Sequence, residues 1–203
     1  SADGFGRFGD ADPATPWGDE ARRYYINSVG KYGAQVQALL KKAAGLEIET
    51  VCPLHGPILS GEALALALEK YGVWSSYAPE EKGVLVAYAS IHGHTARAAL
   101  ELADMLKAEG LQVEAVDLTR RDWAEAVAGA FRYSGLALAA ASYDAGVFPP
   151  MAQFLARLKS KGFKDRAVGL MENGSWGPTA MRTMLAELEG MKGLTILEPK
   201  ITI

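Results

Sequence analysis

Residues 84–203 alternate short apolar runs with longer amphipathic stretches, and this alternation constrains the fold more than any other feature. The run Val84–Ala89 is continuously apolar, as in a strand buried on both faces of a parallel sheet. Residues 95–109 carry apolar side chains at helical spacing and end at Gly110, which is typical of a helix C-terminus. Later segments repeat this order, with strands expected at 112–118, 136–141, 166–171 and 194–203 and helices at 123–131, 151–158 and 179–188. Because parallel neighbours need right-handed crossovers, the order predicts an α/β fold with a doubly wound, five-stranded parallel sheet.

The first 77 residues follow a different pattern. A long helical stretch over residues 21–44 is interrupted by Gly30 and Gly33, and a short strand is expected at 47–51. A rigid loop and a second helix over 64–71 follow. Pro79 and the charges around it indicate a boundary, so two parts are predicted, 1–77 and 78–203. The chain starts without methionine and stops inside a predicted strand, so we expect a portion of a longer protein.

The composition excludes several classes of partner. Lys and Arg number 21 against 24 Asp and Glu, and no basic run occurs, so neither nucleic acid nor an anionic membrane is an expected partner. The single cysteine, Cys52, cannot form an intrachain disulfide, and no apolar run reaches the ~20 residues of a membrane span. No targeting signal opens the sequence, so a cytoplasmic location is expected.

Three loops follow predicted strands at the edge where open α/β sheets bind ligands. The first, residues 90–95, offers two hydroxyls and the start of a helix, a combination that favours phosphate binding. Simple N-capping of the helix is the alternative. The loop lacks the glycine pattern of nicotinamide dinucleotide sites and the Gly-Lys-Ser/Thr of P-loop NTPases.

The other two loops each combine an aromatic residue with a glycine. Residues 142–150 combine Tyr143, an acid and a glycine with a double proline, and residues 172–178 place Trp176 between glycines. Packing of Tyr143 and Phe148 into the core is the alternative for the former. One phosphate site beside two aromatic loops favours a mononucleotide with a planar ring, and FMN fits better than ATP. The candidate cofactor-binding residues are Ser90, Ile91, His92, Gly93, His94, Thr95, Ser142, Tyr143, Asp144, Ala145, Gly146, Asn173, Gly174, Ser175, Trp176 and Gly177.

The sequence resembles the C-terminal portion of flavodiiron proteins, also called A-type flavoproteins. Residues 78–203 look like a flavodoxin-like FMN-binding domain without its last helix, and residues 1–77 look like the end of a metallo-β-lactamase-like domain. The resemblance is carried by residues 1–6, 22–33, 53–57, 88–95 and 143–151.

This resemblance implies a role for two further residues. Asp3 would bridge two irons and His55 would be the last histidine ligand. The remaining family ligands would lie upstream, so the two-iron site is expected to be incomplete in this chain. His92 and His94 have a spacing that could chelate a metal, but framing of the phosphate and flavin is the favoured interpretation.

The resemblance also implies a function. FMN would relay electrons from a rubredoxin-like or NADH-linked donor to the irons, which would reduce dioxygen to water or nitric oxide to nitrous oxide. A head-to-tail homodimer is implied as well. Asp144 and Glu172 are expected near the flavin edge, where their charges would lower the potential of the second flavin electron. The alternative is a stand-alone FMN electron carrier without catalysis of its own.

Overall fold

The computed structural model describes residues 17–54 and 56–203. The chain forms two compact units, with the boundary between Ala78 and Pro79. In the described ranges, no helix has the length and apolar character needed to cross a membrane.

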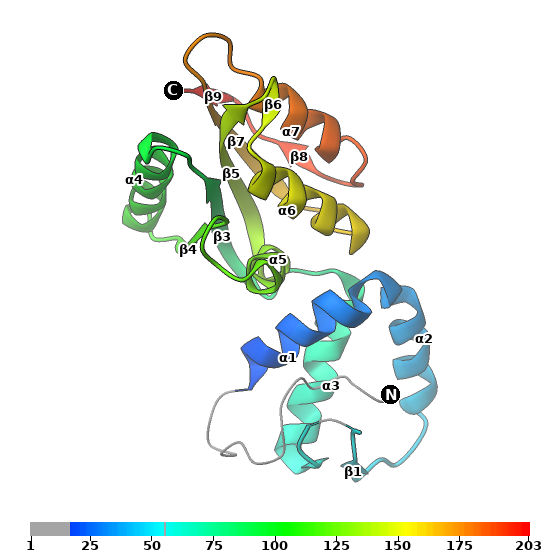
Figure 1. Cartoon of the computed structure of the whole chain (residues 1–203). Coiled ribbons are helices and arrows are strands. Elements are labelled where there is room, and N and C mark those ends of the chain that lie inside the picture. The colour runs from blue at the N-terminus through cyan, green and yellow to red at the C-terminus, as the bar shows by residue number, and fades with distance from the viewer. Residues whose placement is uncertain (1–16, 55) are drawn as a thin grey trace. The chain divides into compact units, whose positions relative to one another are not determined.

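The second unit is built on a parallel sheet (Figure 1). Its strands run in the order β4-β3-β5-β7-β8, and β9 also pairs with β7. This is the flavodoxin-like order, in which the second strand lies at one edge and the first beside it. The predicted fold class is confirmed. The strand bounds are β3 (Glu81–Ala89), β4 (Gln112–Asp117), β5 (Tyr133–Tyr143), β7 (Ala167–Asn173), β8 (Thr195–Ile196) and β9 (Ile201–Thr202).

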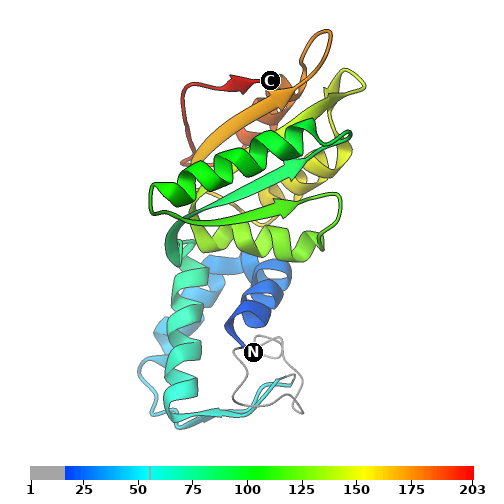
Figure 2. The same ribbon diagram turned by 90° about the vertical axis from the view of Figure 1, so that its left-hand side faces the viewer.

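Helices cover both faces of this sheet (Figures 1 and 2). On one face lies α4 (His94–Ala108), and on the other lie α5 (Trp123–Arg132), α6 (Pro149–Ser160) and α7 (Ala180–Leu188). Ala99 and Ala103 of α4 are fully buried against Val86, Ala137 and Met171 of the sheet. These small side chains let α4 pack closely on the strands, and this packing holds the first turn of α4 in place at the edge of the sheet.

Two details differ from the sequence-based expectation. The strand expected at 194–203 is split into β8 and β9. The amide of Leu197 still donates to the oxygen of Val168 at 2.8 Å, and the break follows at residues 198–200, where Pro199 has no amide hydrogen to donate. In addition, β6 (Gly146–Val147) pairs antiparallel with the end of β5. Periodicity does not reveal a strand of this length.

The first unit is mainly helical. Its elements are α1 (Gly18–Tyr24), the π-helical η1 (Tyr25–Val29), the 3-10 helix η2 (Gly30–Tyr32), α2 (Gly33–Ala43), an antiparallel pair β1 (Thr50–Val51) and β2 (Leu59–Ser60), and α3 (Gly61–Ser76). The predicted helix 21–44 thus changes its winding at both glycines, and the helix predicted at 64–71 is longer than expected.

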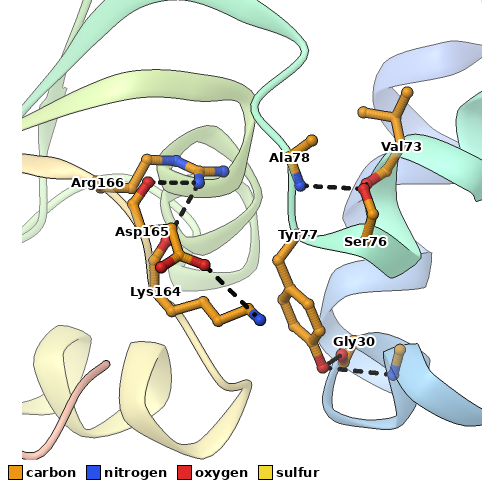
Figure 3. Close-up of polar contacts among 9 residues, drawn as sticks. Gly30, Val73, Ser76, Tyr77, Ala78, Lys164, Asp165 and Arg166 are labelled. Carbon is orange, nitrogen blue, oxygen red and sulfur yellow. Dashed lines mark hydrogen bonds and ion pairs between the residues drawn. The ribbon is translucent and has the colours of Figure 1, made fainter. Parts of the chain in front are cut away.

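Close approach of α2 to the end of α3 explains one of these glycines. A Cβ on Gly33 would lie 2.4 Å from the backbone oxygen of Ser75, so no larger residue fits without a shift. The Tyr77 hydroxyl then links the same segments, because it donates to the oxygen of Gly30 at 2.8 Å and accepts from the amide of Gly33 at 3.3 Å (Figure 3).

Buried Tyr25 makes the stability of the first unit sensitive to alkali. Its ring is fully buried, with ring centroids 5.0 Å from Tyr71 and 5.4 Å from Trp74, and this burial raises the pKa of Tyr25. An unfolded tyrosine titrates near pH 10, so the unfolded state loses its proton first as the pH rises. The contribution to stability is therefore complete below about pH 10 and is lost above it, at up to ~1.4 kcal/mol per pH unit.

The corresponding measurement is denaturant unfolding at pH 9, 10 and 11, followed by near-ultraviolet circular dichroism. The Tyr25→Phe variant should show a shallower fall of unfolding free energy above pH 10 than the wild type. Equal slopes in the two proteins would contradict the assignment.

Candidate functional site

A cavity of about 860 Å³ opens at the carboxyl ends of β3, β5 and β7. This volume is in the range of small-molecule and cofactor sites. The three loops singled out in the sequence all contribute to its lining, and of their predicted residues only Gly93 and Gly146 do not line it. The predicted residues that line it are Ser90, Ile91, His92, His94, Thr95, Ser142, Tyr143, Asp144, Ala145, Asn173, Gly174, Ser175, Trp176 and Gly177.

Several lining residues were missed by the sequence reasoning. Arg97 and Glu101 lie one and two turns into α4, and Thr179 precedes α7. Ile203 also lines the cavity, directly after β9. Ile203 could have been found, because the last strand of a parallel sheet ends at the same edge as its neighbours.

The start of α4 offers amide donors to the cavity. Gly93 precedes the helix with a φ of 91°, and no side chain caps the first turn. The amide of Gly93 itself donates to the Ser90 hydroxyl oxygen at 3.0 Å. An uncapped helix N-terminus carries free N–H groups and a partial positive charge, so this point of the cavity favours an anion.

The next two helices offer no such donors. The Asp122 carboxylate accepts from the amide of Ala124 at 2.9 Å and thereby caps α5. Helix α6 begins with Pro149 and Pro150, which have no amide hydrogen. Neither helix start therefore suits an anion.

Side chains from two strands close the start of α7. The Ser142 hydroxyl oxygen accepts from the amides of Thr179 and Ala180 at 2.8 and 3.1 Å, and the Glu172 carboxylate accepts from the amide of Met181 at 2.8 Å. Among the helices described in the second unit, α4 alone thus begins with amides that neither a side chain nor proline has removed. Of these four helix starts, only that of α4 favours an anion.

The same contacts correct the expectation for Glu172. It was expected near the flavin edge, but it is buried, is absent from the cavity lining, and also accepts from the Thr202 hydroxyl at 3.1 Å. Its carboxylate joins α7 to β9. Asp144, in contrast, is exposed and lines the cavity.

Two aromatic side chains stand exposed among the lining residues. Trp176 is fully exposed and Tyr143 is half exposed, so packing of Tyr143 into the core does not describe it. The Tyr143 ring instead contacts Phe148, with centroids 5.8 Å apart. The loop is held by the Thr179 hydroxyl, which donates to the oxygen of Gly146 at 2.8 Å. Exposed rings at a cavity favour a flat, apolar ligand surface.

The next residues to place are the four that the sequence singled out as possible metal ligands. Asp3 and His55 lie outside the described residues. Both His92 and His94 line the cavity and are exposed. Within residues 17–54 and 56–203, no group of three or more His, Cys, Asp or Glu side chains could hold a metal ion.

Comparison with known proteins gives consistent relatives, although no family model matches the chain. The chain is 24% identical over 188 residues to the rubredoxin-oxygen oxidoreductase of Megalodesulfovibrio gigas, covering 91% of this chain and 46% of that protein. It is 26% identical over 179 residues to the coenzyme F420H(2) oxidase of Methanothermobacter marburgensis, covering 83% of this chain and 44% of the relative. The chain therefore spans about half the length of these curated relatives.

Solved structures agree with these relatives. A flavodiiron protein from Giardia intestinalis matches with a TM-score of 0.89 and 25% identity, covering all of this chain and 52% of the other. The rubredoxin oxygen:oxidoreductase from Desulfovibrio gigas matches with a TM-score of 0.89 over all of this chain and 53% of the other, and its 22% identity shows the fold alone.

Proposed function

From the correspondence of this chain to the C-terminal portion of flavodiiron proteins, we propose that it binds FMN in the cavity of its flavodoxin-like unit and serves in electron transfer. The observation that carries the proposal is the open N-terminus of α4, the one such start among the helices described in the second unit, at a cavity with two exposed aromatic rings. When bound, FMN supplies the redox chemistry, since it accepts and passes on electrons.

The cavity fits the two chemical parts of FMN. The uncapped start of α4 and the hydroxyls of Ser90 and Thr95 would hold the phosphate. Tyr143 and Trp176 would contact the isoalloxazine ring, and the amides of the Gly174–Gly177 segment would face its polar edge. The remaining predicted cofactor residues complete the same three loops.

The single anion site favours FMN over a dinucleotide. A second phosphate would need further donors, but the start of α7 is closed by Ser142 and Glu172 and that of α6 by prolines. Arg97 and Glu101 also line the cavity, but they form an ion pair at 3.9 Å and so add no net charge on the α4 side.

For the whole protein we propose electron transfer from FMN to a two-iron centre that reduces dioxygen to water or nitric oxide to nitrous oxide. Two curated relatives are named as an oxygen oxidoreductase and an oxidase, which supports this class of reaction. Residues 1–77 would be the end of the metallo-β-lactamase-like domain, with Asp3 and His55 as two of its iron ligands. A rubredoxin-like or NADH-linked donor, a head-to-tail homodimer and a cytoplasmic location complete the proposal. Iron analysis and gas consumption by the longer protein would separate it from a stand-alone FMN carrier.

Titration of this chain with FMN, FAD and riboflavin tests flavin binding. Phosphate bound through charge-assisted hydrogen bonds is worth ~1.5–3 kcal/mol per bond, so riboflavin should bind at least ~100-fold more weakly than FMN. FAD should also bind more weakly, because its second phosphate finds no open helix start. Flavin fluorescence quenching gives the three dissociation constants. Absence of binding by all three flavins, or equal binding of riboflavin and FMN, would contradict the proposed site.

A further inference from the structure

The hydroxyl of Thr95 connects two elements that are far apart in the sequence. Thr95 lies in the first turn of α4, is 1% exposed, and lines the cavity. The side-chain amide of Asn173, at the end of β7, donates to the Thr95 Oγ1 at 3.4 Å. These residues are 78 positions apart in the sequence.

The chemistry of the two groups sets the direction of this bond. An amide NH₂ group donates hydrogen bonds and does not accept them, so the Thr95 oxygen must be the acceptor. A hydroxyl has one proton, and in this arrangement the Thr95 proton remains available to donate elsewhere. The Ser90 hydroxyl likewise keeps its proton available to donate, because its oxygen accepts from the amide of Gly93. Both hydroxyls of the loop are thereby left as donors beside the uncapped helix start.

We propose that Asn173 is a positioning residue, which holds the Thr95 hydroxyl with its proton directed to an anion at the start of α4. Asn173 would in this way determine the preference of the site for a phosphorylated over an unphosphorylated flavin. This inference rests on the proposed function and adds the residue that sets its specificity.

The sheet fixes Asn173 for this task. Asn173 pairs with Ala141 at the end of the β5–β7 ladder, so its backbone position is set by two neighbouring strands. Thr95 is held from the other side, because α4 packs against β3, β5 and β7. A hydroxyl without a fixed partner rotates among several orientations, and holding it in one reduces the entropy lost on anion binding.

A double-mutant cycle in the full chain tests the inference. The measured quantity is the dissociation constant of riboflavin divided by that of FMN. A change confined to the phosphate alters the FMN constant and leaves the riboflavin constant unchanged. Asn173→Ala should lower the ratio by about fivefold, the size of one net hydrogen bond, with riboflavin affinity unchanged. Thr95→Val should lower it by about tenfold or more. The double variant should match Thr95→Val alone, since Asn173 acts through Thr95.

Asn173→Ser provides a second variant, which keeps a polar side chain that is too short to reach Thr95. It should show the same loss as Asn173→Ala. Equal weakening of both flavins by Asn173→Ala, or additive losses in the double variant, would overturn the inference while leaving the proposed function in place. A wild-type chain that binds no flavin would instead overturn the proposed function and this inference together.

Discussion

Replacing His94 by aspartate is expected to weaken FMN binding by at least ~100-fold while changing riboflavin binding by less than about threefold. His94 is the first residue of α4 and lines the cavity. A carboxylate at this position would accept from the free amides of the first turn and repel a phosphate dianion nearby. Repulsion between charges ~4–5 Å apart at an effective dielectric constant of ~20 amounts to ~3 kcal/mol or more, which corresponds to the expected loss.

Two matched variants separate this effect from others. In His94→Asn the new side chain has the shape of aspartate without its charge, so FMN affinity should fall by less than about tenfold. Ala108→Asp adds the same charge to the exposed last residue of α4, about 20 Å from the first, well beyond the ~8 Å screening length at physiological salt. Its FMN affinity should therefore stay at the wild-type value. Retention of FMN binding by His94→Asp would place the phosphate elsewhere.

Replacing Arg166 by methionine is expected to reduce the unfolding free energy of the second unit by about 4 kcal/mol. Arg166 is 3% exposed, and its guanidinium donates to the backbone oxygens of Tyr133 at 2.8 Å and Phe131 at 3.1 Å. It also donates to the oxygens of Lys164 and Asp165 at 3.1 and 3.2 Å (Figure 3). Burial lowers the pKa of Arg166 by desolvating its charge, and the four carbonyl oxygens accept the hydrogen bonds that water would otherwise accept.

Methionine would fill most of the volume but donate nothing. Two carbonyl oxygens of buried residues at the junction of α5 and β5 would then lose a charged donor, at ~1.5–3 kcal/mol each. Urea denaturation of the variant measures the loss. Arg182→Met, on the exposed side of α7, is the matched control and should change stability by less than ~0.5 kcal/mol. A stability loss under 1 kcal/mol for Arg166→Met would mean that water replaces the guanidinium.

Much of the second unit could be predicted from the sequence because its signals are local and repeated. The apolar run at 84–89 and the stripe of α4 each reflect burial of one element, and parallel order follows from the alternation. The split of the last strand was not predicted, although Glu198, Pro199 and Lys200 interrupt its apolar pattern and a proline argues against a continuous strand. The winding change at Gly33 depends on a contact with Ser75, which no local pattern contains.

For the site, the rule that ligands bind at strand ends located the three loops but not the direction of every side chain. Side chains alternate between the two faces of a strand, and this rule applied to β7 gives the direction of Glu172. Met171 packs against α4 and Asn173 contacts Thr95 of α4, so Glu172 between them must face the opposite side, where it meets α7. Arg97 and Glu101 were missed because exposed charges on a helix carry no signal of the cavity beside them.

The capping of α7 by Ser142 and Glu172 has a consequence for how this site can change during evolution or engineering. The helix start is anchored by side chains of β5 and β7, and Thr179 directly before it adds contacts to Gly146 and Thr183. Residues 175–177 can therefore be exchanged or lengthened with little effect on the scaffold, and fully exposed Trp176 lies among them. Ligand and partner preference can diversify in this segment independently of folding.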